Sequence, residues 1–328
     1  MQNLQQVIIN ECIEVIKISF NNNTLIEELT DIKIVANKKL TGNSFQISTA
    51  YTVLLKYYES NPDHEIRQIL NLLNKILIQN YEISEFNYFD KKIIPDDLDT
   101  ASSIVRVLFT KKQSKAYLEK VNLNKKNEFV HTWFMANKNY NSDYFHSTNI
   151  YKNNEFYQMD VLLNHLITLK FTFDQNIETS LATYFKKFNL YNYWYIPTLY
   201  CSYQYSKLCL NLRNKELLAP IATIVIAAQR ELNFDPFYVH HKCKFEEIRK
   251  IIKMENINNN WLNIGFLFGI IKNYSRATRF DGRDLQESLL TSIYKNLDSF
   301  EPSLYLSMGY TAYKSKILSR IFLLDTLL

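Results

Sequence analysis

Glycine and proline are scarce in this chain, with 5 glycines and 6 prolines among 328 residues. Five glycines could hardly supply a phosphate-cradling loop or a dinucleotide-binding fingerprint, and neither motif is present. The sequence also contains no Ser-His-Asp set for nucleophilic catalysis. So few helix breakers in so long a chain favour helices joined by short polar loops.

Cysteine and long apolar runs are also limited. The four cysteines show no paired spacing: Cys12, Cys201, Cys209 and Cys243. Neither a disulfide framework nor a zinc motif is therefore expected, and the adjacent His240 and His241 lack further ligands. No apolar run is long enough to cross a bilayer, and the first residues are polar, so we expect no signal peptide and a reduced, cytoplasmic location.

Charge of one sign is not concentrated anywhere. The 38 basic and 33 acidic residues give a net charge of +5 that is spread along the chain, whereas a nucleic-acid binder would show a basic stripe. A hydrophobic content of 47% allows a substantial core. No Gly/Ser-rich linker interrupts the sequence, so we expect one domain over 1–328, with 1–44 as a helical extension packed on it.

Apolar residues recur at helical spacing along most of the chain. We expect helices over about 4–16, 45–58, 66–78, 99–110, 113–121, 127–136, 156–171, 177–188, 197–211, 214–231, 243–254, 259–273, 283–296 and 311–327. No hairpin signature of the Asn-Gly type is present. Helices of this number and length form a bundle, a solenoid or a ring of hairpins, and no known helical-repeat period is visible.

A cluster of three carboxylates is the most informative feature. Asp96, Asp97 and Asp99 follow the apolar pair Ile93-Ile94 and open an expected helix. A carboxylic acid held between apolar segments can stay protonated until it is needed. The alternative is structural, since Asp96 or Asp97 could simply cap the helix with Thr100 in its first turn, and we expect Asp96 to be a cap.

Several segments, in order from about residue 45 to the C-terminus, resemble the α/α-barrel domain of class II terpene cyclases and their prenyltransferase-like relatives. Asp97-Leu98-Asp99-Thr100-Ala101 resembles the Asp-x-Asp-Thr-Thr motif of the drimane-type branch. The other similar segments are His131-Thr132-Trp133-Phe134, Met159 to Leu166, Trp194 to Tyr200, and Phe300 to Tyr305 followed by Tyr313-Lys314-Ser315-Lys316. The final motif has Lys314 where the family has glycine, and we expect no part of residues 1–328 to form the phosphatase-like domain of the drimane-type enzymes.

The resemblance implies an all-α, α/α-barrel fold and a reaction that begins by protonating an alkene. It makes Asp99 the proton donor, kept neutral by burial, while Asp97 orients it and Thr100 replaces a second partner carboxylate. The implied substrate is a linear prenyl diphosphate, farnesyl or geranylgeranyl, whose diphosphate is retained. A separate phosphatase could then act on the product.

The same resemblance suggests residues that would surround the substrate. Asp160 and Asn164 lie on one expected helix. Aromatic faces could shield the cation as a group, although for each one taken separately we expect core packing. The aromatic candidates are Trp133, Phe134, Trp194, Tyr195, Tyr200, Tyr305 and Tyr313. His165, on the same apolar helix, is expected to be a satisfied core histidine.

A diphosphate would need cationic or hydroxyl partners. The candidates are Ser315, Lys316, Arg276 and Arg279, the two arginines belonging to a cluster with Arg283 that could instead be a solvated surface. Mg²⁺ could accompany the diphosphate, with no protein-bound cofactor. Two other hypotheses remain: an inactive helical scaffold that kept the barrel, and a protein-prenyltransferase-like subunit, ranked last because its zinc ligands are missing.

Overall fold

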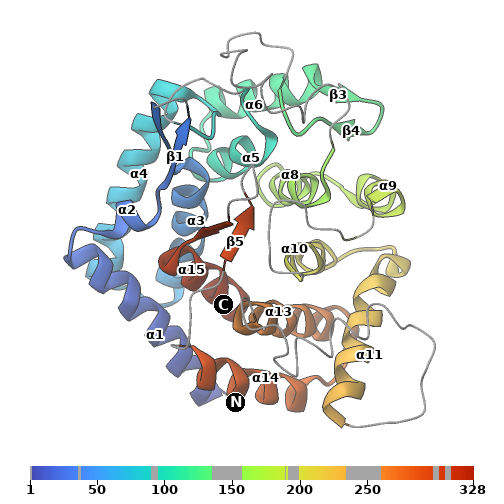
Figure 1. Ribbon diagram of the computed structural model, residues 1–328. Coiled ribbons are helices and arrows are strands. Elements are labelled where there is room, and N and C mark those ends of the chain that lie inside the picture. The colour runs from blue at the N-terminus through green and yellow to red at the C-terminus, as the bar shows by residue number, and fades with distance from the viewer. Residues whose placement is uncertain are drawn as a thin grey trace. The chain divides into compact units, whose positions relative to one another are not determined.

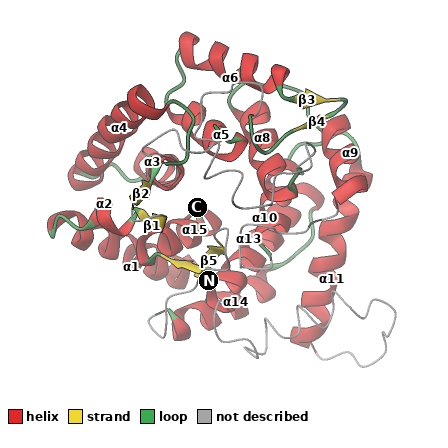
Figure 2. Cartoon of the chain, turned by 45° about the horizontal axis from the view of Figure 1, so that its top comes forward, coloured by secondary structure: helices red, strands yellow, loops and turns green. Residues whose placement is uncertain are grey.

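The computed structural model describes residues 2–35, 38–89, 95–134, 157–188, 190, 199–233, 260–297, 303–306 and 312–328. Helices account for most of this part of the chain, and the strands are short (Figure 2). The chain divides into two compact units, Val15–Asn189 and Met1–Glu14 with Leu190–Leu328. Helix α1 (Gln2–Asn21) contributes residues to both, and the single-domain expectation stays a prediction.

The unit Val15–Asn189 holds the acid cluster. Its elements, after α1, are α2 (Leu25–Glu28), β1 (Asp31–Val35), β2 (Lys38–Gly42), α3 (Ser44–Ser60), α4 (His64–Ser84), α5 (Leu98–Val107), α6 (Lys111–Leu123), β3 (Lys125–Lys126), β4 (Phe129–Val130), α8 (Met159–Phe171) and α9 (Glu178–Phe188). Helix α3 packs on α4 and α5, and α5 packs on α6 and α8 (Figure 1). Helix α5 therefore has neighbours on several sides.

The other unit is built around one long helix. Its elements are α10 (Tyr200–Leu208), the 3₁₀ helix η1 (Lys215–Leu218), α11 (Ala219–Asn233), α13 (Asn260–Thr278), α14 (Arg283–Asn296), β5 (Ser303–Leu306), β6 (Ala312–Lys314) and α15 (Lys316–Leu327). Helix α13 packs against α10, α11, α14 and α15. None of the described helices is long and apolar enough to cross a membrane.

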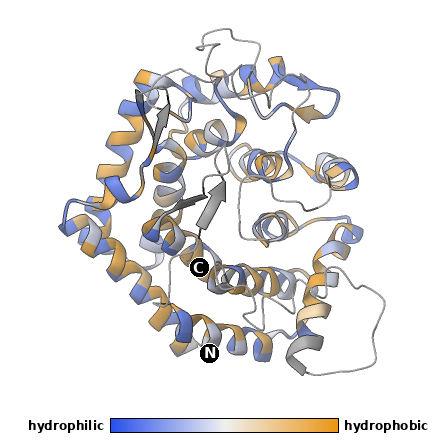
Figure 3. Ribbon diagram, in the orientation of Figure 1, coloured by the Kyte–Doolittle hydropathy of each residue, from blue (hydrophilic) through white to orange (hydrophobic). Residues whose placement is uncertain are grey.

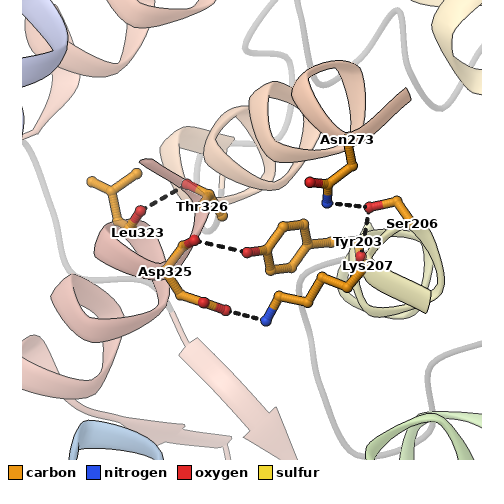
Figure 4. A network of polar contacts seen from close by, with 7 residues as sticks. All are labelled: Tyr203, Ser206, Lys207, Asn273, Leu323, Asp325 and Thr326. Atoms are coloured by element: carbon orange, nitrogen blue, oxygen red, sulfur yellow. Dashed lines mark hydrogen bonds and ion pairs between the residues drawn. The ribbon is translucent and has the colours of Figure 1, made fainter. Parts of the chain in front are cut away.

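A polar network ties α10 to α15 within this unit (Figure 4). The Tyr203 hydroxyl donates to the carbonyl of Asp325 at 2.9 Å, and Lys207 forms an ion pair with the Asp325 carboxylate. Gly269 of α13 is required beside this network, because a Cβ there would lie 2.5 Å from the Tyr203 ring. The network and the close approach fix how α10, α13 and α15 pack.

Helix α4 illustrates how the sequence specifies the outer helices. The Asp63 side chain accepts a hydrogen bond from the Ile66 amide at 3.1 Å and so caps the helix. The buried apolar residues recur at intervals of three and four: Ile66, Ile69, Leu70, Leu73 and Leu77. Most of the charged and amide side chains lie between them on the outer side, where Ile78 and Ile83 are also exposed, so one face of the helix packs on the core (Figure 3).

Helices α5 and α8 differ because they are buried almost throughout. Every residue from Met159 to Thr168 of α8 is buried, and so are Leu98 and Thr100 to Val105 of α5. Polar side chains on such helices must find partners inside the protein. These two helices carry the polar groups of the candidate site.

Three short antiparallel hairpins were not expected from the sequence: β1–β2, β3–β4 and β5–β6. The helix expected over 127–136 is wrong, since β3 and β4 pair there and Asn127 turns the chain with a φ of 55°. Likewise β6 occupies the start of the helix expected over 311–327, so α15 begins only at Lys316. Residues 1–44 are helical only to Glu28, because β1 and β2 follow. The helix expected over 243–254 lies outside the described residues.

Candidate active site

The acid cluster lies in a short extended segment that enters α5. This segment is held by the end of α4 on one side and by residues 132–134 on the other. Three backbone hydrogen bonds do this: Asp97 N to Phe86 O at 3.4 Å, Leu98 N to Thr132 O at 2.8 Å, and Phe134 N to Asp96 O at 2.8 Å. Hydrogen bonds between backbone groups alone thus fix the position of the motif.

Asp96 is an ion-pair residue, and the expectation that it caps the helix is wrong. Its carboxylate contacts the Lys120 ammonium of α6, which also lies 3.2 Å from Glu85. The side chains of Lys120 and Asp96 are only 11% and 10% exposed. The pair therefore anchors the motif to α6 and keeps Asp96 away from any role as a helix cap.

Asp97 is the N-cap of α5. Its Oδ1 accepts a hydrogen bond from the Thr100 amide at 2.7 Å, and the residue is 5% exposed. Burial raises the pKa of Asp97 from its ordinary value of 3.8 to about 8. The amide of Thr100 opposes this rise, and the charge of Asp99 adds to it. Asp97 therefore carries its proton at neutral pH.

Three buried oxygens beside this cap have no hydrogen-bond partner among the described residues: Asp97 Oδ2, Thr100 Oγ1 and Thr132 Oγ1. The Thr100 hydroxyl lies near enough to favour the Asp97 anion slightly, but it does not reach hydrogen-bond geometry. Unsatisfied buried polar atoms are rare because each costs about 1–3 kcal/mol. Three of them at one helix start mark a place where a water or a ligand would be stabilised.

Asp99 is held by α8. The Asn164 side-chain amide donates to Asp99 Oδ1 at 2.6 Å, and Asn164 itself is buried. One turn earlier on the same face of α8 lies Asp160, which is fully buried and whose Oδ1 accepts from the Val161 amide at 3.1 Å. The Asn164 contact fixes the orientation of the Asp99 carboxyl group.

The two acids differ from the expectation in their burial. Asp99 was expected to be the buried, neutral acid, but it is only half-buried, whereas Asp97 is buried and has the strongly raised pKa. The physical reason is the helix start. The capping residue points back over the first turn into the packed segment, while the residue two positions later faces α8.

A second polar chain lies along the same helices. The Tyr117 hydroxyl of α6 lies 2.5 Å from His165 Nδ1 and 3.0 Å from Ser102 Oγ. The Thr168 hydroxyl donates to the carbonyl of Ser102 at 3.0 Å. Burial lowers the pKa of His165 to about 3, so its ring is neutral and Nδ1 accepts the tyrosine proton. His165 is a satisfied core histidine, as the sequence predicts.

The aromatic candidates fall into separate groups. Trp133 and Phe134 are buried next to the motif, and Trp133 pairs with Asp97 in an isolated antiparallel bridge. Tyr200 belongs to the other unit, where its ring packs edge-on against Phe266 and Phe322 in the core. Tyr305 and Tyr313 lie opposite each other on β5 and β6. Trp194 and Tyr195 lie outside the described residues.

The diphosphate candidates do not form a cluster among the described residues. Ser315 caps α15, accepting from the Leu318 amide at 3.1 Å, and Lys316 is exposed. Arg276 and Arg279 are exposed as well. The third arginine of their cluster, Arg283, pairs with Asp281 at 2.7 Å. Ser315, which matches the serine of the family's C-terminal motif, thus caps a helix in this chain.

The described residues contain no grouping of three or more His, Cys, Asp or Glu side chains that could hold a metal ion. Cys12, Cys201 and Cys209 are buried and form no disulfide among the described residues. Burial raises the pKa of the Cys12 thiol to about 12, so this thiol stays protonated.

Two residues of the site were missed in the sequence. Lys120 and Tyr117 lie on α6, whose expected range was correct but whose side chains gave no separate signal. A lysine or tyrosine on an amphipathic helix looks the same whether it faces solvent or pairs with a buried acid or histidine. Only the packing of α6 against α5 shows which applies.

No protein-family model matches this sequence, and no curated protein matches it either. A solved structure does. It is a variant of the type II terpene cyclase MstE from Scytonema in complex with geranylgeranyl dihydroxybenzoate, its substrate. The match covers 99% of this chain and 97% of that chain, with 10% identity and a TM-score of 0.67. This likeness shows the fold, and it confirms the all-α, α/α-barrel class that the sequence predicts.

Proposed function

We propose that this protein is a type II terpene cyclase that starts ring closure by protonating an alkene. The observation that carries the proposal is the acid pair at the start of α5. Asp97 is buried with a raised pKa and an unpartnered oxygen, and Asp99 beside it is fixed by Asn164. The fold of a terpene cyclase supports the same reaction.

In this proposal Asp99 is the proton donor, and the form of the protein that reacts is the one in which Asp99 carries a proton. Its proton leaves Oδ2 and forms a C–H bond with the terminal alkene, whose π electrons are consumed and which becomes a tertiary cation. Further alkenes of the same chain then attack the cation and close rings. Loss of a proton or capture of water ends the reaction. Asn164 stabilises the carboxylate that remains, through its hydrogen bond to Oδ1.

Asp97 has a complementary role. Because burial keeps it protonated, it places no second negative charge beside Asp99. A neutral neighbour makes Asp99 a stronger acid than a carboxylate neighbour would, since like charges disfavour ionisation. The N-terminus of α5 favours the developing anion in the same way. Thr100 contributes its amide to Asp97 and a hydroxyl where the family has a further carboxylate.

The substrate is a linear prenyl chain with a polar head. We propose farnesyl or geranylgeranyl diphosphate with the diphosphate retained, in the manner of the drimane-type enzymes. A prenylated aromatic acid is the other head group to test, since the similar cyclase binds geranylgeranyl dihydroxybenzoate. For a diphosphate, Lys316, Arg276 and Arg279 are exposed cations that could meet it, together with Mg²⁺ and a separate phosphatase for the product.

The test is incubation of the full chain with each substrate: farnesyl diphosphate, geranylgeranyl diphosphate and geranylgeranyl dihydroxybenzoate, each with and without Mg²⁺. Diphosphate products are dephosphorylated and analysed by gas chromatography with mass spectrometry, and the aromatic product by liquid chromatography. We expect cyclised product from wild type and none from Asp99→Asn. Cyclisation by Asp99→Asn at the wild-type rate would refute the assigned donor.

An inactive scaffold is the second candidate, and one observation favours it. Asp97 caps α5 with the same hydrogen bond that a purely structural aspartate makes. A scaffold predicts no turnover of any of the three substrates, and it predicts that Asp97→Ser, which preserves a cap, leaves the protein's other properties unchanged. Turnover by wild type that is lost in Asp97→Ser would exclude it.

A further inference from the structure

Two phenylalanine side chains are exposed where α5 and α8 end. Phe109 lies two residues beyond the end of α5 and is 55% exposed, and Phe171 is the last residue of α8 and is 58% exposed. Single exposed apolar residues are ordinary on protein surfaces. Here two large aromatic side chains lie at the ends of α5 and α8, two helices that pack together.

The two helix ends are joined by a rigid aromatic base. The Phe173 ring, just beyond α8, meets the Phe109 ring edge-on with centroids 5.6 Å apart. Its other side stacks on Tyr117 at 5.9 Å with an interplanar angle of 8°. Thr110, next to Phe109, caps α6 by accepting from the Gln113 amide at 3.2 Å. The exposed rings are therefore held on packed elements rather than on a loose loop.

Cations surround these rings. Lys111 and Lys112 are exposed and make no ion pair within the described part of the chain, and Lys170 lies over the Phe171 ring at 5.3 Å. Arg106 is half-exposed one turn before Phe109. Two acidic residues lie near in the sequence, Asp174 and Glu119. Asp174 is exposed, and the Glu119 carboxylate lies 3.7 Å from the Lys115 ammonium. The local balance is positive.

The position of Lys111 and Lys112 is unfavourable for folding. They occupy the first turn of α6, which contains no acidic residue, so two positive charges lie at the positive end of the helix dipole. Neither lysine gains a described partner there that would offset this cost. A surface that binds a negatively charged partner would explain why these two lysines lie at the start of α6 and why the rings of Phe109 and Phe171 beside them are exposed.

We propose that the surface made by Phe109, Lys111, Lys112, Lys170, Phe171 and Phe173, the aromatic–lysine patch, docks on an anionic lipid membrane. Aromatic side chains insert at the boundary between headgroups and acyl chains, and lysines extend to the headgroup phosphates. A negative leaflet attracts each lysine near its surface, and salt screens that attraction. The inference does not depend on the proposed reaction.

Vesicle flotation of the full chain tests the proposal. The probes are vesicles of phosphatidylcholine alone and of phosphatidylcholine with phosphatidylglycerol in equal parts, at low and at high salt. We expect binding to the anionic vesicles at low salt, and binding to neutral vesicles to be about tenfold weaker or undetectable. Lys111→Gln with Lys112→Gln should weaken binding to anionic vesicles by about 25-fold, because each lysine contributes about fivefold.

The aromatic side chains are tested separately. Phe109→Ser with Phe171→Ser should weaken binding by at least tenfold. The matched control is Ile83→Ser, which removes an apolar side chain that is 70% exposed on α4, outside the patch. The control should bind like wild type. Melting curves of all variants show whether Phe109→Ser disturbs the contact with Phe173, and the lysine pair tests the patch without touching that contact.

Three outcomes would overturn the proposal. Wild type could fail to bind anionic vesicles at low salt, or both multiple variants could bind as well as wild type. Alternatively, wild type could form a dimer in solution that the phenylalanine variants dissociate, without binding vesicles. That last result would make the patch an interface between two copies of the chain.

Discussion

The Asn164 amide nitrogen lies 2.6 Å from Asp99 Oδ1, and one turn further along α8 the Thr168 hydroxyl lies 3.0 Å from the carbonyl oxygen of Ser102. Asn164 and Thr168, four residues apart on α8, thus each make one hydrogen bond to α5. The first ends on a carboxyl group with a proposed chemical role, and the second ends on the backbone. The pair allows a catalytic contribution to be separated from a structural one.

Asn164→Leu should lower the rate of cyclisation about 100-fold. The variant removes the donor that stabilises the Asp99 carboxylate, and the loss of one such preorganised donor has this size of effect. Steady-state kinetics with the accepted prenyl substrate measure it, and the loss should appear in kcat rather than in KM. Thr168→Val, which breaks the neighbouring hydrogen bond, is the matched control and should keep kcat within about threefold. Equal losses in both variants would mean that Asn164 only holds the helices together.

Stability should decrease as the pH rises towards 8. Burial raises the pKa of Asp97 to about 8 and that of Asp31 to about 7, from an ordinary value of 3.8. A raised carboxyl pKa favours the protonated form in the fold. Its stabilising contribution is therefore complete below about pH 4 and is lost as the pH rises through 7 and 8.

Melting temperatures at pH 5 to 8 check this prediction, at roughly 2 °C for each kcal/mol. We expect Asp97→Asn and Asp31→Asn each to flatten the decrease, the first over the whole range up to about pH 8 and the second only up to about pH 7. Asp31 accepts hydrogen bonds from Gln46 at 2.5 Å and from Tyr88, so its asparagine variant also loses some stability at every pH. A wild-type slope retained in Asp97→Asn would contradict a raised pKa for Asp97.

Lys120→Met should destabilise the protein by about 2–3 kcal/mol. The variant leaves the nearly buried Asp96 carboxylate without its ion pair, and uncompensated buried charges are costly. Urea denaturation measures the change. The control is Lys17→Met, which removes a lysine 2.7 Å from Asp63, a partner that is 31% exposed. That loss should be about 1 kcal/mol or less, because water can solvate the carboxylate. Similar losses in the two variants would show that Asp96 is better solvated than its exposure indicates.

Tyr117→Phe should cost about 1–3 kcal/mol in the free energy of unfolding. The hydroxyl is shared between His165 and Ser102, so its removal leaves buried polar atoms on both α8 and α5 without a partner. Tyr184→Phe is the matched control, since the Tyr184 hydroxyl makes a single hydrogen bond of 2.9 Å to the carbonyl of Glu128 at a partly exposed position. The control should lose less than half as much. A greater loss for Tyr184→Phe would contradict the importance of the shared hydroxyl.

The sequence predicts the helices well where an apolar stripe is long, as from Ile66 to Leu77 of α4, because burial of one face dominates the local energetics. It fails at β3–β4, where apolar residues occur at helical spacing but Asn127 adopts a positive φ and reverses the chain. The spacing of apolar residues does not distinguish the helix α4 from the hairpin β3–β4. The hairpin leads into residues 132–134, whose backbone pairs with the segment before α5, and this long-range pairing cannot be read from the local pattern.

For the site, the resemblance predicts that Asp97 orients Asp99 and that Asn164 lies near the substrate, and the structure adds a hydrogen bond from Asn164 to Asp99. The resemblance does not identify which carboxyl is buried, because that depends on which of them caps α5. The same ambiguity affects Ser315, which matches the family ending but caps α15. Helix starts attract Ser, Thr and Asp for backbone reasons, so motifs that open helices combine folding signals with chemical ones.

The neutral ring of His165 affects how pH titrations of this protein near neutrality are interpreted. With a pKa of about 3, this imidazole carries no charge from mildly acidic to alkaline buffers, and its Nδ1 is already occupied by Tyr117. An inflection near pH 6 or 7 in any activity curve must therefore originate from a different group. In a titration followed by magnetic resonance, His165 should give the flat signal against which the other five histidines of the chain are compared.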